Sequence, residues 1–472
     1  MMAALTACSS GAAAKRDRPN FLILFVDDMG WSDLGVTGSD LYETPAIDQL
    51  AADGVRFTTA YAACTVCSPS RAALMTGMYP ARTHVTDWIR GHIRPHAKLK
   101  VPDWTMKLEH KYTTIAEALK GAGYKTAHIG KWHLMPRGEP DEDDYLPTRE
   151  GFDINIGGNA WGAPATYFYP YRRGKRGLGP MPPGGHEGEY LTDRLTEEAI
   201  KVLDQWKDSP FLMYFAFYNV HMPLEAKQED IDHFTPLIKP GLRHHNATYA
   251  AMVASVDRTV GRMREKLAEL GLAENTVIIF TSDNGGLDRK GTGDPTENAP
   301  LREGKGSVYE GGVRVPAIVY APGVTPAGTT TDEPIITMDF YPTILALAGV
   351  EGDPKHNANV DGVNLLPLLK DPGARLGRQT LYWHYPHYHS QGATPYSALR
   401  DGDFRLIEFF EDDHVELYDL KKDPGETHDL VAAMPAKARA LTAKLHAWRE
   451  RVGAQLPTPN PDYDPKNPTR RP

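Results

Sequence analysis

The run 64–77 (CTVCSPSRAALMTG) contains the residues whose types and spacing are best suited to chemistry. Cys67 is followed by Pro69 and Arg71, and residues 71–76 have the composition of a short helix that ends at Gly77. This order places Cys67 at or just before a helix N-terminus, where free N–H groups and the helix dipole favour negative charge. We therefore expect a thiolate at Cys67 or an anion bound beside it.

Cys64 and Cys67 also form a C-x-x-C pair, which can be a redox pair or half of a zinc site. A zinc site needs a second pair, and the only other cysteine is Cys8. A thioredoxin-like redox motif belongs early in a small domain, whereas this chain is far larger. Two buried, inert cysteines are the ordinary alternative.

Oxygen ligands follow two expected strands. The apolar run 20–26 is typical of a buried parallel strand and leads directly into Asp27 and Asp28. Adjacent carboxylates are costly at the carboxyl end of a strand unless a divalent cation offsets their charge, and α/β sheets bind ligands at that edge. A solvated loop or a helix cap is the alternative. The strand expected at 276–280 is likewise followed by an oxygen-ligand pair, Asp283 and Asn284.

Basic side chains and histidines follow other expected strands. Lys131 and His133 come after the run 124–129, and a spacing of two can point both to the same side, as a cation beside a general base requires. A surface lysine and a packed histidine are the default interpretation of such a pair. His221 lies just past the strand expected at 210–217. Lys305 stands between two glycines, which could also form a plain turn.

Together these motifs resemble those of the type I sulfatases, a family of the alkaline phosphatase superfamily. The pattern C-x-P-S-R-x-x-L-x-T-G at 67–77 matches at every fixed position, and G-K-W-H at 130–133 and the block 304–316 match further family motifs. The resemblance runs from residue 20 to about 452. It implies an α/β fold with a large mixed, mostly parallel sheet flanked by helices and a smaller C-terminal antiparallel sheet plus helix.

The resemblance also implies a mechanism. Cys67 would be oxidised to formylglycine, an aldehyde whose hydrate attacks the sulfur, and one Ca²⁺ would lie beside it because the ligands are hard oxygen donors. The implied metal ligands are Asp27, Asp28, Asp283, Asn284 and the modified residue 67. The implied catalytic roles are Arg71 to hold the hydrate, His133 as the base that eliminates sulfate, His221 as the general acid, and Lys131 and Lys305 to complete an electrostatic cradle with Arg71.

The composition of the whole chain limits its function classes. Of 472 residues, 41% are hydrophobic and 24% are charged, which is typical of a globular protein. The net charge of −9 attracts no anions by itself, so sulfate or phosphate must be held by local positive groups, and we expect no nucleic-acid partner. Three cysteines exclude a disulfide framework, and no run approaches the length of a transmembrane helix.

The sequence predicts four parts: a signal remnant and tether at 1–19, a catalytic α/β domain at 20–372, an antiparallel sheet plus helix at 373–455, and a Pro-rich tail at 456–472. Residues 5–8 (LTAC) resemble a bacterial lipobox, which favours a clipped lipoprotein signal, a lipid anchor at Cys8 and a periplasmic or cell-surface location. The irregular insertion 136–190 is rich in Gly, Pro and aromatic residues, and it either forms part of a pocket or simply covers the core.

A sulfated carbohydrate is the expected substrate. This preference rests on the export signal, the aromatic segment 157–171 and the run His384-Tyr-Pro-His387-Tyr-His389, which could line an acceptor pocket. A formylglycine-generating or anaerobic sulfatase-maturating enzyme is the implied partner. Two alternatives stay open, a phosphodiesterase or phosphonate monoester hydrolase of the same superfamily and a catalytically silent sugar-binding protein. A silent sugar-binding protein should lack a metal ligand or the nucleophile, and this sequence lacks neither.

Overall fold

The computed structural model of the chain describes residues 18–288 and 294–466. Cys8 and most of the expected signal remnant lie outside these residues. Within the described ranges, no helix combines the length and the apolar character needed to span a bilayer.

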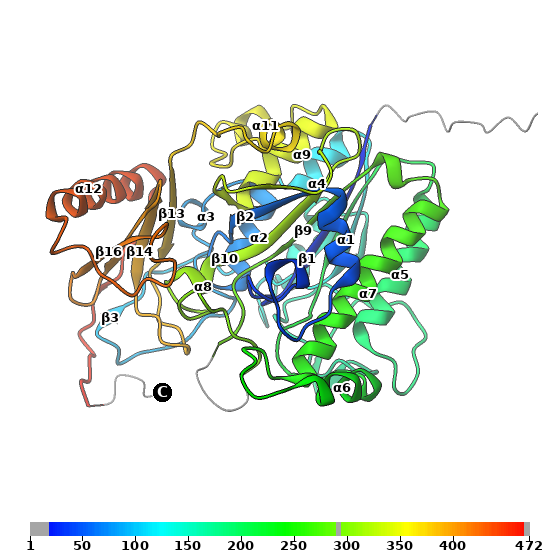
Figure 1. Cartoon of the computed structure of the whole chain (residues 1–472), viewed down its shortest axis with the longest axis horizontal. Helices are drawn as coiled ribbons and strands as arrows, with labels where there is room; N and C mark the ends of the chain where they lie inside the picture. The colour runs from blue at the N-terminus through cyan, green and yellow to red at the C-terminus, as the bar shows by residue number, and fades with distance from the viewer. Residues whose placement is uncertain (1–17, 289–293, 467–472) are drawn as a thin grey trace, which may run out of the picture.

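A central sheet of nine strands organises the described residues, in the order β11-β2-β10-β9-β1-β8-β4-β5 with β12 also paired to β2 (Figure 1). All pairs are parallel except those of β10, which is antiparallel to both β2 and β9. The strands are β1 (Asn20–Val26), β2 (Val55–Tyr61), β4 (Lys125–Gly130), β5 (Ile154–Ile156), β8 (Phe211–Ala216), β9 (Thr276–Ser282), β10 (Arg314–Tyr320), β11 (Thr329–Thr331) and β12 (Ile335–Ile336).

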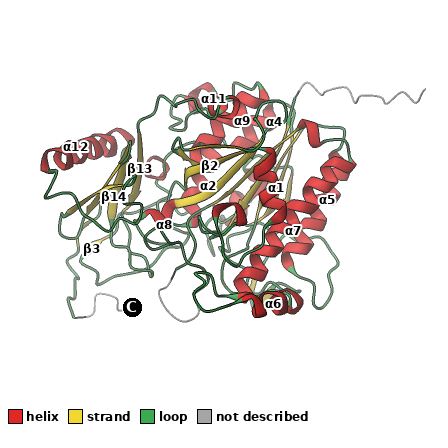
Figure 2. Ribbon diagram, in the orientation of Figure 1, coloured by secondary structure: helices red, strands yellow, loops and turns green. Residues whose placement is uncertain are grey.

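Helices cover both faces of this sheet (Figure 2). Alternate residues of β1 pack into two separate cores, Leu22 and Leu24 into one and Phe21 and Ile23 into the other, which is why its sequence is apolar throughout. The first core includes residues of α1 (Pro45–Asp53), α5 (Leu191–Trp206), α6 (Gln228–Phe234) and α7 (Ala247–Glu269). The second includes residues of α2 (Cys67–Thr76), α4 (Ile115–Gly121), α9 (Phe340–Ala348) and α11 (Leu366–Lys370).

A smaller antiparallel sheet in the order β13-β14-β15-β16 lies beside the large one, with α12 packed on it (Figure 1). A third core joins this sheet to the 308–313 segment, and the buried Arg405 pairs across it with Glu310 at 2.6 Å. The elements are β13 (Thr380–Tyr385), β14 (Tyr396–Asp401), β15 (Phe404–Phe409), β16 (Val415–Asp419), α8 (Glu310–Val313) and α12 (Pro435–Val452).

Short elements complete the chain. They are α3 (Pro80–Thr83), α10 (Pro354–Asn357), β3 (Leu99–Lys100) paired with β17 (Thr458–Pro459), β6 (Arg172–Arg173) paired with β7 (Arg176–Gly177), and 3-10 helices at Gly35–Thr37, Glu142–Tyr145, Pro147–Arg149, Thr235–Leu237, Ala273–Asn275 and Thr337–Asp339.

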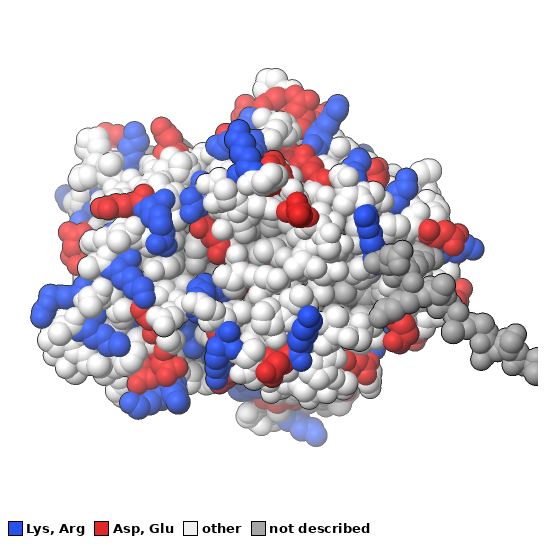
Figure 3. Space-filling view, turned by 90° about the horizontal axis from the view of Figure 1, so that it is seen from above, with Lys and Arg blue, Asp and Glu red and all other residues white. Residues whose placement is uncertain are grey.

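The predicted fold class is confirmed: the central sheet is mixed and mostly parallel, helices flank it, and the C-terminal sheet is antiparallel. The predicted division into four parts stays a prediction. The helix expected at 71–76 begins earlier, at Cys67, because Ser68, Pro69 and Ser70 already belong to its first turn. Pro69 fits there because first-turn N–H groups have no partner within the helix. On the face seen in Figure 3, basic and acidic side chains are interspersed.

Candidate active site

Four oxygen-bearing side chains meet where β1 and β9 end. The two strands are parallel neighbours with Val26 opposite Ser282, so the residues that follow them lie side by side. The backbone N–H of Asp28 donates to Asp283 Oδ1 at 3.2 Å, and Asn284 Nδ2 donates to Asp28 Oδ1 at 2.8 Å. Asp27 belongs to the same group, and all four residues are almost fully buried.

Three basic side chains converge on these carboxylates. Arg71 donates from Nε and Nη2 to Asp283 Oδ2 at 2.9 and 2.7 Å, and from Nη1 to the Lys131 carbonyl. Lys131 Nζ lies 2.8 and 2.7 Å from the two oxygens of Asp27. Lys305 Nζ lies 2.6 and 2.8 Å from those of Asp28.

The carboxylates do not respond alike to this arrangement. Burial raises the pKa of Asp27 to about 8, and the opposing charge of Lys131 only partly offsets it. For Asp28, burial also acts to raise the pKa, but Lys305 and then His221 outweigh it and hold the value well below its usual range. Three carboxylates packed this closely therefore depend on positive charge to remain ionised.

The donor set suits a hard divalent cation. Oδ1 of Asn284 is buried and has no hydrogen-bond partner among the described residues, although a buried amide oxygen normally has one. Ligand atoms of Asp27, Asp28, Cys67 and His221 lie within 4.8 Å of one another, which is close enough to share one ion. Carboxylate and amide oxygens are the ligands that calcium prefers. Sequence motifs had placed His221 near the leaving group, and not among these ligand atoms.

Cys67 is the first residue of α2, and its side chain is buried among these charges. Its Sγ lies 3.4 Å from Lys305 Nζ and 3.6 Å from Asp27 Oδ1. The expected thiolate is wrong for the unmodified residue, because burial raises the pKa of the thiol to about 12 despite the two lysines nearby. Cys64 is also buried, and neither cysteine is part of a disulfide.

The two histidines are held by backbone carbonyls. His133 Nε2 lies 2.6 Å from the carbonyl oxygen of Ile89, and because a carbonyl only accepts, Nε2 carries the proton. Its Nδ1 is then a buried acceptor without a partner among the described residues. His221 is arranged oppositely, with Nδ1 donating to the Met222 carbonyl at 2.8 Å and Nε2 3.6 Å from Asp28 Oδ2. Burial, and then Lys305, lower the pKa of His221 to about 3.

Backbone conformation helps to place these groups. Asp28 and His133 both have left-handed φ values, 61° and 59°. Residues with a Cβ rarely adopt this region, and such strain tends to occur at functional sites. Asp28 lies two residues after the end of β1, and His133 lies three residues after the end of β4.

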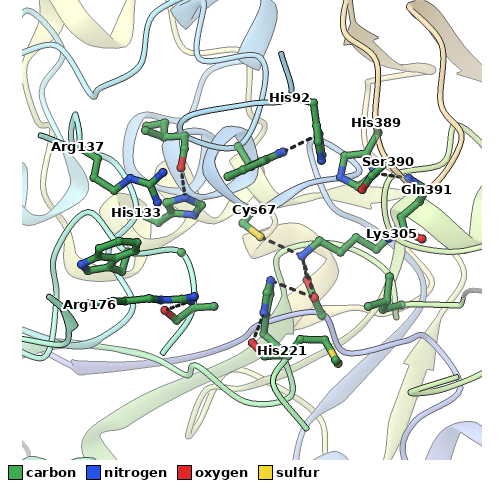
Figure 4. A pocket seen from close by; sticks show the side chains of 18 residues that line it. Cys67, His92, His133, Arg137, Arg176, His221, Lys305, His389, Ser390 and Gln391 are labelled. Carbon is green, nitrogen blue, oxygen red and sulfur yellow. Dashed lines mark hydrogen bonds and ion pairs between the residues drawn. The ribbon is translucent and has the colours of Figure 1, made fainter. Parts of the chain in front are cut away.

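A pocket of about 370 Å³ opens above the cluster (Figure 4). Of the predicted residues, Asp28, Cys67, His133, His221 and Lys305 line it, whereas Arg71 and Lys131 are buried beneath. The pocket is also lined by Trp161 and His389, from the two segments expected to line an acceptor pocket, and by Trp88, Arg137 and Arg176, which no motif singled out.

The aromatic insertion and the histidine-rich run contribute less to the pocket than expected. Trp161 lines it, but Tyr167 and Tyr171 are buried in the first core. His389 lines it, whereas His384 bonds instead to Ser397 and the Gln455 carbonyl. The predicted pocket role is therefore wrong for His384. Arg137 and Arg176 belong to the basic residues of the insertion 136–190. Because basic residues of a loop are usually solvated, no feature of the sequence indicated that these two line a pocket.

The site combines a buried cysteine at a helix N-terminus with a group of side chains that could hold a metal ion. Residues 19–350 match the family model Sulfatase, and residues 304–453 match the model for the C-terminal part of N-sulphoglucosamine sulphohydrolase. The chain belongs to the sulfatase family and is a sulfuric ester hydrolase.

Individual relatives agree with this assignment. A sulfatase of Formosa agariphila is 33% identical over 95% of this chain and 92% of the relative. Human arylsulfatase A is 32% identical over 91% of this chain and 86% of the relative. The crystal structure of Ps i-CgsB in complex with k-i-k-neocarrahexaose has a TM-score of 0.75 and 30% identity, and the match covers 95% of each chain.

Proposed function

We propose that the protein hydrolyses sulfate esters of a carbohydrate, using formylglycine made from Cys67 and one calcium ion. The observation that carries the proposal is the position of Cys67, at the start of α2 and within 3.6 Å of both Lys305 and Asp27. The carbohydrate is supported by the oligosaccharide bound to the similar protein Ps i-CgsB. A catalytically silent sugar-binding protein should lack a metal ligand or the nucleophile, and this chain has the predicted metal ligands and Cys67.

The residues that would hold calcium are Asp27, Asp28, Asp283 and Asn284, with residue 67 beside them. When bound, the ion supplies positive charge that offsets the charge on the sulfate oxygens, and the formylglycine hydrate supplies a hydroxyl group to attack sulfur. Arg71 keeps Asp283 in place through two hydrogen bonds. Its predicted contact with the hydrate stays a prediction.

The basic side chains of the site prepare it for an anion. Lys305 reaches both Asp28 and Cys67, so its Nζ is placed to contact an oxygen of the sulfate group held beside residue 67. Lys131 lies deeper and fixes Asp27. These buried cations act more strongly than they would in water, because the surrounding medium screens them weakly.

The two histidines are suited to proton transfer in different directions. His133 offers Nδ1 as an acceptor, because the Ile89 carbonyl keeps the proton on Nε2, and this is the form that a base for sulfate elimination requires. His221 has Nε2 turned toward Asp28 and Lys305. We propose it as the acid that protonates the leaving oxygen, once a bound anion offsets the charge of Lys305.

The test combines mass spectrometry and kinetics. A formylglycine-generating or anaerobic sulfatase-maturating enzyme would convert Cys67, so peptides covering residues 60–80 should show loss of the thiol at Cys67 and not at Cys64. Activity should rise with the converted fraction, and the preparation should hydrolyse a sulfate ester faster than a phosphate diester. Full activity with an unmodified thiol would refute the mechanism, and a preference for the diester would favour the phosphodiesterase alternative.

Cys64→Ala is the matched control for Cys67→Ala, because both residues are buried cysteines three positions apart. Only Cys67→Ala should abolish turnover. Export and a lipid anchor at Cys8 remain proposals that rest on the sequence motif alone.

A further inference from the structure

One wall of the pocket carries two arginines stacked on a tryptophan. The guanidinium carbons of Arg137 and Arg176 lie 4.6 and 5.1 Å from the ring centroid of Trp161. All three residues line the same pocket as Cys67. Figure 4 shows Arg137 and Arg176 on the side of the pocket away from Lys305 and His389.

In the part of the chain that the structure describes, neither arginine forms an ion pair with a carboxylate. Among the described residues, the guanidinium of Arg137 forms no hydrogen bond or ion pair. Arg176 donates from Nη2 to the carbonyls of Ala163 and Pro164 at 2.8 and 3.0 Å, while its buried Nε has no partner. By contrast, the fully buried Arg405 is paired with Glu310, whereas Arg137 and Arg176 are half-buried.

The positive charges at this wall are electrostatically unfavourable in the absence of a bound anion. Burial lowers the pKa of Arg137, and the nearby charges of Arg90 and Arg176 lower it further, while the charge of Glu142 offsets only part of this. Burial also lowers the pKa of Arg176, and the positive charge of Arg173 lowers it further. Like charges that are partly desolvated and unpaired are unfavourable, and a bound anion would remove that cost.

The wall adjoins the reacting groups. Gly162, next to Trp161, packs so closely on His133 that a Cβ at this position would lie 2.6 Å from the histidine Nε2. A group bound at Arg137 and Arg176 therefore shares one pocket with the sulfate ester at Cys67, instead of occupying a separate surface site.

Resting on the carbohydrate sulfatase function proposed above, we propose that Arg137, Trp161 and Arg176 bind a second anionic group, a sulfate or a carboxylate, on the same carbohydrate. A guanidinium can form two parallel hydrogen bonds with either group. Trp161 holds both guanidinium groups in place, which reduces the entropy lost when the anion binds. The preferred substrate is then a carbohydrate with at least two negative groups.

The test uses matched pairs of oligosaccharides. A singly sulfated disaccharide that the matured enzyme hydrolyses is compared with the same disaccharide carrying one more sulfate, and, in a second pair, a uronate is compared with its uncharged methyl ester. We expect wild type to favour the doubly charged member by about 10–100-fold in kcat/KM, because charge-assisted hydrogen bonds of this strength correspond to such factors. The pair with the larger preference identifies the group as sulfate or carboxylate.

Variants separate recognition from structure. Arg137→Gln and Arg176→Gln should each reduce the preference to a few-fold, whatever they do to the singly charged member, and Arg137→Lys should keep part of it. Arg172→Gln is the control, because Arg172 is exposed in the same hairpin and does not line the pocket. It should keep the wild-type preference. Equal losses on both members would mean that the arginines only support the loop and would overturn the proposal.

A binding measurement distinguishes this inference from the proposed function. Calorimetry with Cys67→Ala measures the affinity for each pair without turnover. A binding preference for the doubly charged member supports the anion site even if no sulfate ester is hydrolysed, in which case the proposed function fails alone. Hydrolysis of the singly charged member with no preference in either assay overturns the anion site alone.

Discussion

Gly162→Ala should reduce turnover through its effect on His133. A Cβ at Gly162 would lie 2.6 Å from Nε2 and 2.8 Å from Nδ1 of that ring, and ordinary contact begins near 3.4 Å. The ring or the loop must therefore move by roughly 1 Å. The imidazole has little freedom to move, because its Nε2 is bonded to the Ile89 carbonyl at 2.6 Å.

A displacement of this size is expected to matter for catalysis. Misplacing a catalytic group by about 1 Å can cost on the order of 10²-fold, so we expect kcat of the matured enzyme on an aryl sulfate to fall by about 10–100-fold, because His133 acts in the elimination of sulfate after the aryl group has left. Gly121→Ala is the matched control, because a Cβ there meets nothing within 4 Å. It should leave kcat unchanged. Thermal melts of both variants exclude general unfolding as the cause.

A double-mutant cycle isolates the contact. In a His133→Ala background the ring is gone and the new methyl group has room, so Gly162→Ala should add little further loss. An equal loss in both backgrounds, or wild-type activity of the single variant, would refute the idea that His133 must stay in this position.

Three other expectations concern separate parts of the protein. His221→Ala should cost about 10²–10⁴-fold on a sulfated sugar and much less on 4-nitrophenyl sulfate, because only the sugar alkoxide needs a proton; an unchanged ratio of the two kcat/KM values would remove the acid role. Asn284→Leu should weaken calcium binding about tenfold or more in calorimetry, because it removes the unpaired buried oxygen; equal affinity would show that this oxygen binds no ion. The pKa of Glu150 is raised to about 8 by burial and then by Glu117. A raised carboxyl pKa gives stability that is complete below about pH 4.5 and is lost as the pH rises through 8, so Glu150→Gln should gain roughly 1–3 kcal/mol over wild type between pH 5 and pH 8 in denaturant melts; a constant difference would contradict this.

Strand positions were predictable because a strand buried on both faces must be apolar along its whole length. The runs at 20–26 and 276–280 met that condition, and the structure places β1 and β9 there. The antiparallel direction of β10 was not predicted, because its sequence is as apolar as that of a parallel strand.

The metal ligands and the pocket wall differ in how far the sequence reveals them. Asp27 and Asp28 are adjacent in the chain. The electrostatic cost of two neighbouring carboxylates at the end of a buried strand can therefore be inferred from the sequence. The stacking of Arg137 and Arg176 on Trp161 joins residues of an irregular segment, where no periodicity indicates which side chains meet.

The sequence by itself determined the nucleophile motif, the pairs of oxygen ligands and the strands that carry them, because each is local and follows from residue type and spacing. Tertiary structure alone decided how they meet. Asp28 and Asp283 are 255 positions apart and become neighbours only because β1 and β9 pair in parallel. The unpaired oxygen of Asn284, the neutral thiol of Cys67 and the fixed tautomer of His133 also depend on burial and on partners from distant segments, which only the folded chain supplies.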